Sequence, residues 1–228
     1  MKILVLCSAR SKSTTLNRFL KLEYPSLSAS RLIPDIEYEN REKFIQESNS
    51  TSNVIYKLYD HELIDYRNKK IIDFTLFDFK HYDKIYVITR NNKFERALST
   101  VGERLLHKKE GRSHYHKDDP IPTLVVNEFD MVRAIKSDLI LTFLVGYVQK
   151  NNNNIKYFDY ENFEQQFLDE FDKDIREINL NISPVNFDYK KITKNYNQAE
   201  KWFNRFNHIL SKLTLSDIQD HNSIFWKL

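Results

Sequence analysis

The chain has 228 residues and a formal net charge of +3, with 41% hydrophobic and 29% charged residues. This length suits one sizeable core, and the composition is that of a globular rather than a disordered protein, so we expect a single domain over residues 1–228. The weak positive charge does not favour non-specific nucleic-acid binding, which needs a clustered basic face. A run of about 18 apolar residues and a signal-peptide pattern are both absent, so we expect a cytoplasmic protein without membrane insertion.

Cysteine and glycine are both scarce. Cys7 is the only cysteine, which excludes an internal disulfide and favours a reducing compartment. The three glycines are Gly102, Gly111 and Gly146, so the chain has no glycine-rich loop of the Walker or dinucleotide-binding type. Most ATPases, kinases and classical dehydrogenases are therefore excluded.

The first third of the chain predicts strands and helices in alternation. Residues 3–6 have the length and branching of a buried strand, and residues 14–22 follow with a helical period. After a turn-rich stretch, Asn40 is predicted to cap a short polar helix. Further strands are predicted in NVIYKLYD and, more briefly, in KIIDF.

The remainder of the chain continues the alternation. HYDKIYVITR predicts a strand buried on both faces, as in a parallel sheet, and a helix follows that ends in a charged, exposed loop. The longest predicted helix runs from an Asn127 cap to NNNN. IKYFDYENF predicts a strand before a helix over residues 163–171. We therefore expect an α/β three-layer sandwich with a central, mainly parallel sheet, whose ligands bind at the carboxyl ends of the strands.

The stretch CSARSKSTT connects the first strand to the first helix. Its hydroxyls and cations belong to Ser8, Arg10, Ser11, Lys12, Ser13, Thr14 and Thr15. Backbone N–H groups, these hydroxyls and the helix dipole can surround a phosphate-like anion, which Arg10 or Lys12 can neutralise. The alternative is a solvent-exposed basic turn with an ordinary N-cap.

A second candidate anion site follows the strand in HYDKIYVITR. Arg90 ends this strand, and Ser99 lies on the helix after it. At about 3.6 residues per turn, a helix that begins near Lys93 returns Ser99 toward the strand end, so Arg90 and Ser99 could clamp one anionic group. An arginine held by a local carboxylate is the equal alternative.

Three blocks of the sequence, in this order, resemble the sulfotransferases that use 3′-phosphoadenosine 5′-phosphosulfate. SARSKSTTL resembles the loop that holds the 5′-phosphosulfate of the cofactor, and YVITRNNKFERALS resembles the strand and helix that hold its 3′-phosphate. IKYFDYENF resembles the later strand with the Tyr-Glu pair of the family. The resemblance implies a P-loop NTPase-like sulfotransferase fold over residues 1–228, as in a compact bacterial or viral-type member.

The resemblance also implies a role for each matched residue. Arg10 corresponds to the basic residue that contacts the transferring sulfo group, and Arg90 and Ser99 correspond to the ligands of the 3′-phosphate. VIYKLYDH looks like a strand whose lysine faces the active site, which makes Lys57 a candidate for charge stabilisation. The phosphate cradle corresponds to Ser11, Lys12, Ser13, Thr14 and Thr15. Lys12 stands where the family usually has glycine.

Sulfo transfer to a hydroxyl or amine builds charge on the bridging oxygen that leaves, and Arg10 or Lys57 can stabilise this charge. By analogy with phosphoryl transfer, positioning and electrostatics do most of the work, here without a required metal. A general base must also remove the proton of the acceptor. The candidates for this base are His61, Asp60, Glu37 and Glu39. His61 is preferred because it follows Lys57 by four residues, and a surface histidine is the equal alternative.

The acceptor could be a glycan, a lipid headgroup, a peptide or another small molecule. We expect no metal site in the histidine-rich loop, because His107, His114 and His116 lack a cysteine or carboxylate at ligand spacing. A flavodoxin-like oxidoreductase, whose FMN-phosphate loop also follows an N-terminal strand, is the second reading. A nucleotide-binding module without catalysis is the third. A low-molecular-weight phosphatase is rejected, because Ser13 stands where that chemistry needs an arginine after Cys7.

Overall fold

The computed structural model describes residues 1–8, 12–33, 38–110, 123–178 and 187–228. Its contacts divide the chain into two compact units. Met1–Asn91 and Ile140–Leu180 form the sheet unit, and Asn92–Leu139 and Asn181–Leu228 form the helical unit. Each unit is described by itself, and the expectation of one domain stays a prediction.

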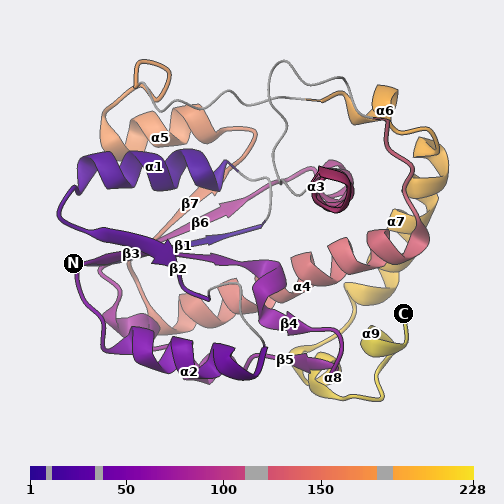
Figure 1. Cartoon of the computed structure of the whole chain (residues 1–228), viewed down its shortest axis with the longest axis horizontal. Helices are drawn as coiled ribbons and strands as arrows, with labels where there is room; N and C mark the ends of the chain where they lie inside the picture. Colours follow the sequence, from indigo (N-terminus) through magenta and orange to yellow (C-terminus); the bar gives the residue numbers. More distant parts are fainter. Residues whose placement is uncertain (9–11, 34–37, 111–122, 179–186) are drawn as a thin grey trace. The chain divides into compact units, whose positions relative to one another are not determined.

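The sheet unit contains a five-stranded sheet in which every neighbouring pair is parallel, in the order β2-β3-β1-β6-β7 (Figure 1). Its strands are β1 (Lys2–Cys7), β2 (Ser28–Arg31), β3 (Val54–Tyr59), β6 (Lys84–Thr89) and β7 (Ile155–Asp159). The parallel α/β sheet that the sequence predicts is thus confirmed. The strand predicted in KIIDF lies outside this sheet, because it pairs antiparallel with its own neighbour as β4 (Ile64–Asp65) and β5 (Lys70–Ile71).

Helices flank this sheet on both faces, as expected for a three-layer arrangement. Figure 1 shows α1 (Ser13–Glu23) and α5 (Phe163–Phe171) on one face, and α2 (Tyr38–Asn49) with the carboxyl-terminal half of α4 (Glu128–Asn151) on the other. The short helices η1 (Asp60–Leu63), η2 (Phe74–Leu76) and η3 (Phe79–His81) lie between β3 and β6 along the chain. The helix that follows β1 along the chain, α1, lies on one face, whereas β4 and β5, which follow β3, lie on the opposite face (Figure 1). Ligands of open α/β sheets bind where neighbouring connections diverge in this way.

The core on the α1 and α5 face is largely aromatic. Phe19 of α1 and Phe167 of α5 meet edge to face, with ring centroids 4.6 Å apart, and such a pair contributes about 0.5–1.5 kcal/mol beyond its buried area. Alternate residues of β1 and β3 point into this core, including Val5 and Ile55. Lys57 follows Ile55 by two residues and is in register with Val5, so its side chain lies on the same face.

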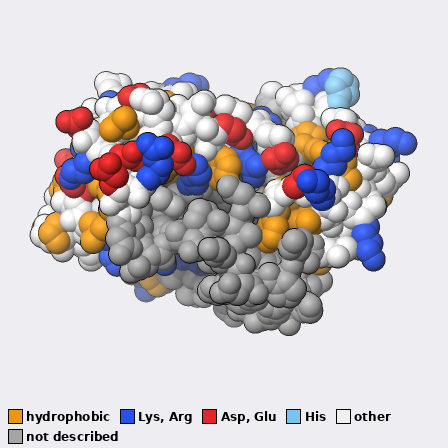
Figure 2. Space-filling model, turned by 90° about the horizontal axis from the view of Figure 1, so that it is seen from above, with side chains coloured by type: hydrophobic (Ala, Val, Ile, Leu, Met, Phe, Trp, Pro, Cys, Tyr) orange, Lys and Arg blue, Asp and Glu red, His pale blue; other side chains and the backbone are white. Residues whose placement is uncertain are grey.

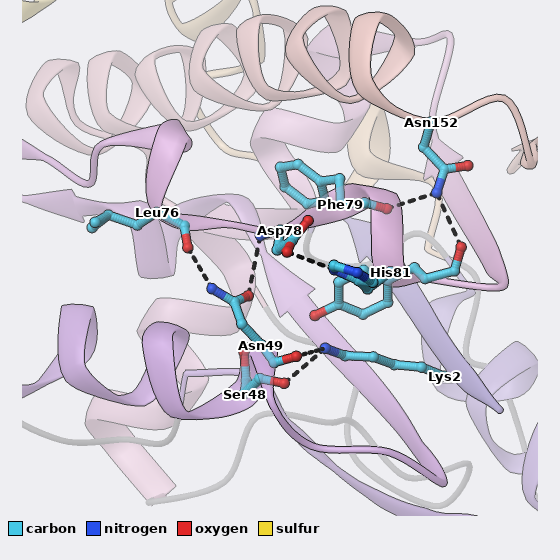
Figure 3. A network of polar contacts seen from close by, with 9 residues as sticks. Lys2, Ser48, Asn49, Leu76, Asp78, Phe79, His81 and Asn152 are labelled. Carbon is cyan, nitrogen blue, oxygen red and sulfur yellow. Dashed lines mark hydrogen bonds and ion pairs between the residues drawn. The ribbon is translucent and has the colours of Figure 1, made fainter.

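The amino-terminal end of the sheet is joined to α2 by a polar network (Figure 3). The Nζ atom of Lys2 donates to the carbonyl oxygens of Ser48 and Asn49, at 2.7 and 3.3 Å. These carbonyls end α2, where the helix dipole favours a cation. The side chain of Asn49 donates to the carbonyl of Leu76 at 2.8 Å and accepts from the backbone N–H of Asp78 at 3.1 Å. The network therefore connects β1, α2 and the segment before β6.

The sequence NNNN ends α4, as predicted, and its second member has a tertiary role. Asn152 is buried, and its amide donates to the carbonyl oxygens of Phe79 at 2.7 Å and Tyr82 at 3.0 Å (Figure 3). Its side-chain oxygen accepts from the backbone N–H of Asn154 at 2.7 Å. Asn153, by contrast, is exposed. The chain after α4 is therefore held to η3 by one of four identical residues.

In its described residues, the helical unit contains α3 (Lys93–Glu110), the amino-terminal half of α4, and four further helices. These are α6 (Tyr189–Ile192), α7 (Tyr196–Leu210), α8 (Leu215–Gln219) and α9 (Ile224–Lys227). Asn127 is confirmed as the N-cap of α4, because its side-chain oxygen accepts from the backbone N–H of Asp130 at 2.8 Å. None of the described helices is long and apolar enough to cross a membrane.

Two predicted boundaries are wrong. Asn40 does not cap α2, because the helix begins two residues earlier, at Tyr38. The charged stretch that begins at Leu106 was expected to be a loop, yet α3 continues through Glu110. Residues 106–110 contain no proline or glycine to stop the helical period. The rest of that predicted loop, residues 111–122, lies outside the described residues.

Candidate functional site

Lys57 and Thr14 meet at the carboxyl ends of β1 and β3. The Nζ atom of Lys57 donates to the Thr14 hydroxyl at 3.3 Å and lies 4.6 Å from the centroid of the Tyr59 ring. Lys57 is only 7% exposed. It is buried because the β3 register places it under the first turn of α1. The structure thus brings together two residues that the sequence assigned separately to charge stabilisation and to the phosphate cradle.

The loop before α1 is described in part. Ser8 and Ser13 are buried, and Thr15 is half-buried in the first turn of α1. Arg10 and Ser11 lie outside the described residues, so their proposed contacts with the sulfo group and the phosphate stay predictions. Lys12 precedes α1 with φ 61° and ψ 11°, in the left-handed region that glycine adopts most readily. The lysine therefore takes the backbone conformation that the family's usual glycine would favour.

Tyr160, immediately after β7, has two cationic side chains over its ring. The Nζ atom of Lys12 is 4.9 Å from the centroid of its ring, and the guanidinium carbon of Arg90 is 4.4 Å from it. Lys12 also pairs with Glu164, with Nζ and Oε1 3.3 Å apart. A cation over an aromatic face is stabilised by the ring quadrupole. Tyr160 thus connects a cation from the first loop with one from the end of β6.

Glu161 is a further contact of Arg90. The Nε atom of Arg90 lies 3.6 Å from one carboxylate oxygen of Glu161, and the backbone N–H of Asn91 donates to the other at 3.1 Å. Arg90 therefore has the local carboxylate that the sequence left open as an alternative. Its role as a phosphate ligand stays a prediction. An anion that competes with Glu161 for the guanidinium would meet an arginine already oriented by Tyr160.

Ser99 lies on α3 in the helical unit. It is buried, and its hydroxyl oxygen accepts a hydrogen bond from the hydroxyl of Tyr189 at 2.9 Å. Arg90 belongs to the sheet unit. The predicted clamp of Arg90 and Ser99 on one phosphate therefore stays a prediction.

Glu62 is a candidate functional residue that the sequence reasoning missed. It lies in η1, directly after β3, and is 6% exposed. Its Oε2 atom accepts from the backbone N–H of Tyr59 at 2.9 Å. Its Oε1 atom is buried, has no hydrogen-bond donor among the described residues, and lies 3.7 Å from Nη1 of Arg31. The sequence DHEL gives no sign of this burial, because Leu63 is the one apolar residue beside Asp60, His61 and Glu62 in this segment.

Burial raises the pKa of Glu62 to about 7, against its ordinary value of 4.5. The hydrogen bond from Tyr59 and the charges of His61, Arg31 and Arg41 act in the opposite direction and favour the carboxylate. The loss of hydration therefore outweighs these four contributions. A carboxyl group that titrates near neutral pH can take up and release a proton under ordinary conditions.

His61, the preferred base from the sequence, is less enclosed. Its side chain is 44% exposed, and its ring lies 5.3 Å from that of Tyr59. Its Nδ1 atom is 3.5 Å from the carboxylate of Asp60, which is buried and accepts from the backbone N–H of His61 at 2.8 Å. The role of His61 stays a prediction. Glu37 lies outside the described residues, and Glu39 lies in α2 with its side chain outside them.

Cys7 is the last residue of β1, and the charges of Lys57, Asp60 and Glu62 act on its thiol. Its side chain is fully buried, with Sγ 3.7 Å from the carbonyl oxygen of Leu58. Burial raises the pKa of the Cys7 thiol to about 12, although the charge of Lys57 lowers it. A thiol of this kind is not a nucleophile at neutral pH. The geometry thus supports the rejection of a phosphatase that uses Cys7.

Charges of both signs are interspersed on the face of the sheet unit that carries α1 and α5 (Figure 2). Ion pairs connect α1 and its preceding loop to the α5 region, namely Lys12 with Glu164 and Glu23 with Lys173.

The described residues include no group of three His, Cys, Asp or Glu side chains that could hold a metal ion. The side chain of His107, and the whole of His114 and His116, lie outside them.

Comparison with protein-family models gives no match, and comparison with curated proteins gives no significant one.

Proposed function

We propose that the protein is a sulfotransferase that moves the sulfo group of 3′-phosphoadenosine 5′-phosphosulfate to a hydroxyl or amine. The contact between Lys57 and Thr14 is the observation that carries this proposal. It puts a buried ammonium group beside the first turn of a helix, at the carboxyl ends of two parallel strands. Helix N-termini and fixed cations both stabilise anions, and the effect is larger where water is excluded.

The remaining basic residues suit the other charges of the cofactor. In the proposed reaction Lys57, together with Arg10, stabilises the negative charge that develops on the bridging oxygen as the sulfo group leaves. Lys12 and Arg90 are 4.9 and 4.4 Å from the Tyr160 ring centroid, so both are oriented before any ligand arrives. Arg90 is assigned to the 3′-phosphate, and Ser11, Ser13, Thr14 and Thr15 to the phosphosulfate cradle.

The strand order argues against the flavodoxin-like alternative. Counted along the chain, the five parallel strands lie in the order second, third, first, fourth, fifth. Flavodoxin-like sheets have the order second, first, third, fourth, fifth. Because β3 separates β1 from β2 here, the first loop has different neighbours from an FMN-phosphate loop of that fold. A nucleotide-binding module without catalysis keeps the same site and is distinguished from an enzyme by turnover.

The test combines binding with turnover on the full chain. Calorimetry with adenosine 3′,5′-bisphosphate is expected to show saturable binding, and a labelled-sulfo assay over hydroxyl and amine acceptors is expected to show transfer. Arg90→Ala is expected to weaken binding roughly 10- to 100-fold, because a hydrogen bond to a charged group contributes about 1.5–3 kcal/mol. Arg90→Lys should recover part of the affinity.

Lys84→Ala is the matched control. Like Arg90→Ala, this substitution removes one positive charge, but at the opposite end of β6. There the Nζ atom of Lys84 donates to the Tyr24 hydroxyl at 3.3 Å. Bisphosphate affinity should be unchanged in this variant. Failure of the wild-type protein to bind the bisphosphate contradicts the proposal. Binding without transfer to any acceptor class would instead identify the non-catalytic module.

A further inference from the structure

Only one of the two carboxylate oxygens of Glu62 accepts a hydrogen bond from a described residue. The backbone N–H of Tyr59 fixes Oε2 at 2.9 Å, whereas Oε1 is buried without a hydrogen-bond donor in the described part of the chain. Nη1 of Arg31 is 3.7 Å from Oε1, beyond hydrogen-bonding distance, and Nη1 of Arg41 donates to the backbone carbonyl of Glu62 at 2.6 Å. A buried acceptor without a donor costs about 1–3 kcal/mol, so such a group in a native structure calls for a ligand or a proton.

Glu62 and Lys57 belong to the same electrostatic neighbourhood. Apart from the dominant effect of burial, Lys57, Asp60 and Glu62 all influence the pKa of the Cys7 thiol at the end of β1. The Tyr59 ring also connects them, because Lys57 and Arg31 both lie over it, at 4.6 and 5.4 Å from its centroid. Glu62 and the ammonium group that is assigned to the leaving charge therefore both act on the same end of β1.

We infer that Glu62, rather than His61, is the general base that takes the proton of the acceptor, and this inference rests on the proposed sulfo transfer. The acceptor O–H or N–H bond breaks as its heteroatom bonds to sulfur, and the proton goes to Oε1 of Glu62. The bond from sulfur to the bridging oxygen breaks at the same time, and its electron pair stays on the adenosine bisphosphate. Glu62 then returns the proton to solvent.

The two rival groups in η1 are less suited to this role. Asp60 is equally buried, but the oxygen that accepts from the backbone N–H of His61 at 2.8 Å also lies 3.5 Å from Nδ1 of the His61 ring, so this carboxylate serves His61. His61 is 44% exposed and has Asp60 as its own carboxylate partner. Glu62 combines burial, an available oxygen and a pKa raised to about 7 by loss of hydration. A base with a pKa near the working pH removes protons most effectively.

The test is the Glu62→Gln variant, which preserves the shape of the side chain and removes the base. Its kcat is expected to fall about 10²–10⁴-fold, with unchanged affinity for adenosine 3′,5′-bisphosphate. In the wild-type protein kcat/KM should rise with pH through about 7, the pKa of Glu62, and the variant should lose this limb. The wild-type profile provides a test that does not depend on folding of the variant.

Asp65→Asn is the matched control. Asp65 is a buried carboxylate of the sheet unit that is fully engaged by the backbone N–H groups of Arg67 and Asn68 and by the Asn68 amide. Its removal should leave the pH profile in place. Two results would overturn the inference and leave the proposed function in place, provided that the wild-type protein transfers the sulfo group. The first is that Glu62→Gln keeps both kcat and the rise of kcat/KM with pH. The second is that His61→Asn abolishes this rise. If the wild-type protein neither binds the bisphosphate nor transfers, the proposed function fails and the inference falls with it.

Discussion

At the scale of single residues, Lys12 combines a glycine-like backbone with a cationic side chain. Its φ of 61° lies in the left-handed region, where an ordinary side chain crowds the backbone. Its ammonium group pairs with Glu164 and lies over Tyr160. Lys12 therefore places a cationic side chain at a position whose backbone conformation favours glycine.

The backbone cost at Lys12 can be measured by comparing two variants that both lose the ammonium group. Lys12→Gly should be more stable than Lys12→Ala by about 1 kcal/mol, because only alanine retains a Cβ in the left-handed region. Arg18, exposed in the middle of α1, is the control. There the order should reverse, with Arg18→Gly less stable than Arg18→Ala by about 1 kcal/mol. Equal stability of the two Lys12 variants would contradict the left-handed assignment.

At the scale of elements, the two ends of the sheet differ in the residues that they carry. The carboxyl ends of β1, β3, β6 and β7 are followed by the residues of the candidate site. The amino-terminal ends of β1 and β6 are joined to α2 and to the chain after α4 by Lys2, Asn49 and Asn152 (Figure 3). Substitutions at this second end should therefore change stability and leave ligand binding in place.

Asn152 provides the test of this division. Asn152→Ala should lower the free energy of unfolding of the sheet unit by about 2–4 kcal/mol, because it removes the side-chain donor of two buried carbonyls and the side-chain acceptor of a backbone N–H. Asn153→Ala, one residue further on at an exposed position, should change it by less than about 0.5 kcal/mol. Both tryptophans, Trp202 and Trp226, lie in the helical unit, so the measurement is hydrogen exchange of the β1 amides. Equal effects of the two substitutions would show that the Asn152 contacts do not hold the unit together.

At the scale of the whole molecule, the pKa of Glu62 links folding to pH. The unfolded chain loses this proton near pH 4.5, and the folded chain keeps it to about pH 7. Between these values the folded state binds more protons than the unfolded state, so the contribution of Glu62 to stability falls as pH rises. Below pH 4.5 and above the folded pKa its contribution is constant.

The resulting prediction concerns the difference between two proteins across that window. From pH 4.5 to 7 the free energy of unfolding of the wild-type sheet unit should fall relative to Glu62→Gln, by at most about 1.4 kcal/mol per pH unit. Hydrogen exchange of β1 amides at a series of pH values, corrected for intrinsic exchange, measures it. Asp65→Asn should keep the wild-type slope, because the pKa of Asp65 is lowered from 3.8 by its hydrogen bonds and its contribution is lost only at more acidic pH. A wild-type slope in Glu62→Gln would contradict the raised pKa.

The sequence by itself was sufficient for features that depend on neighbours along the chain. The apolar run at residues 3–6, the helix over residues 163–171 and the Asn127 cap are all found in the structure, because hydrophobic period and capping are local properties. The parallel sheet followed from the alternation of strands and helices. The sulfotransferase assignment, its cofactor and the roles of Arg10, Arg90 and Ser99 stay predictions.

Only the tertiary structure decided which side chains meet and which are deprived of water. Lys57 donates to Thr14, which lies 43 positions earlier in the sequence. The ammonium group of Lys12 lies over the ring of Tyr160, which follows the last strand of the sheet. Glu62 looks in the sequence like a solvated residue beside a more promising histidine, yet it is the buried one with an unused oxygen. The physical reason is that burial, and with it the pKa of a carboxyl group, depends on segments that pack together in space, which the order of neighbouring residues does not specify.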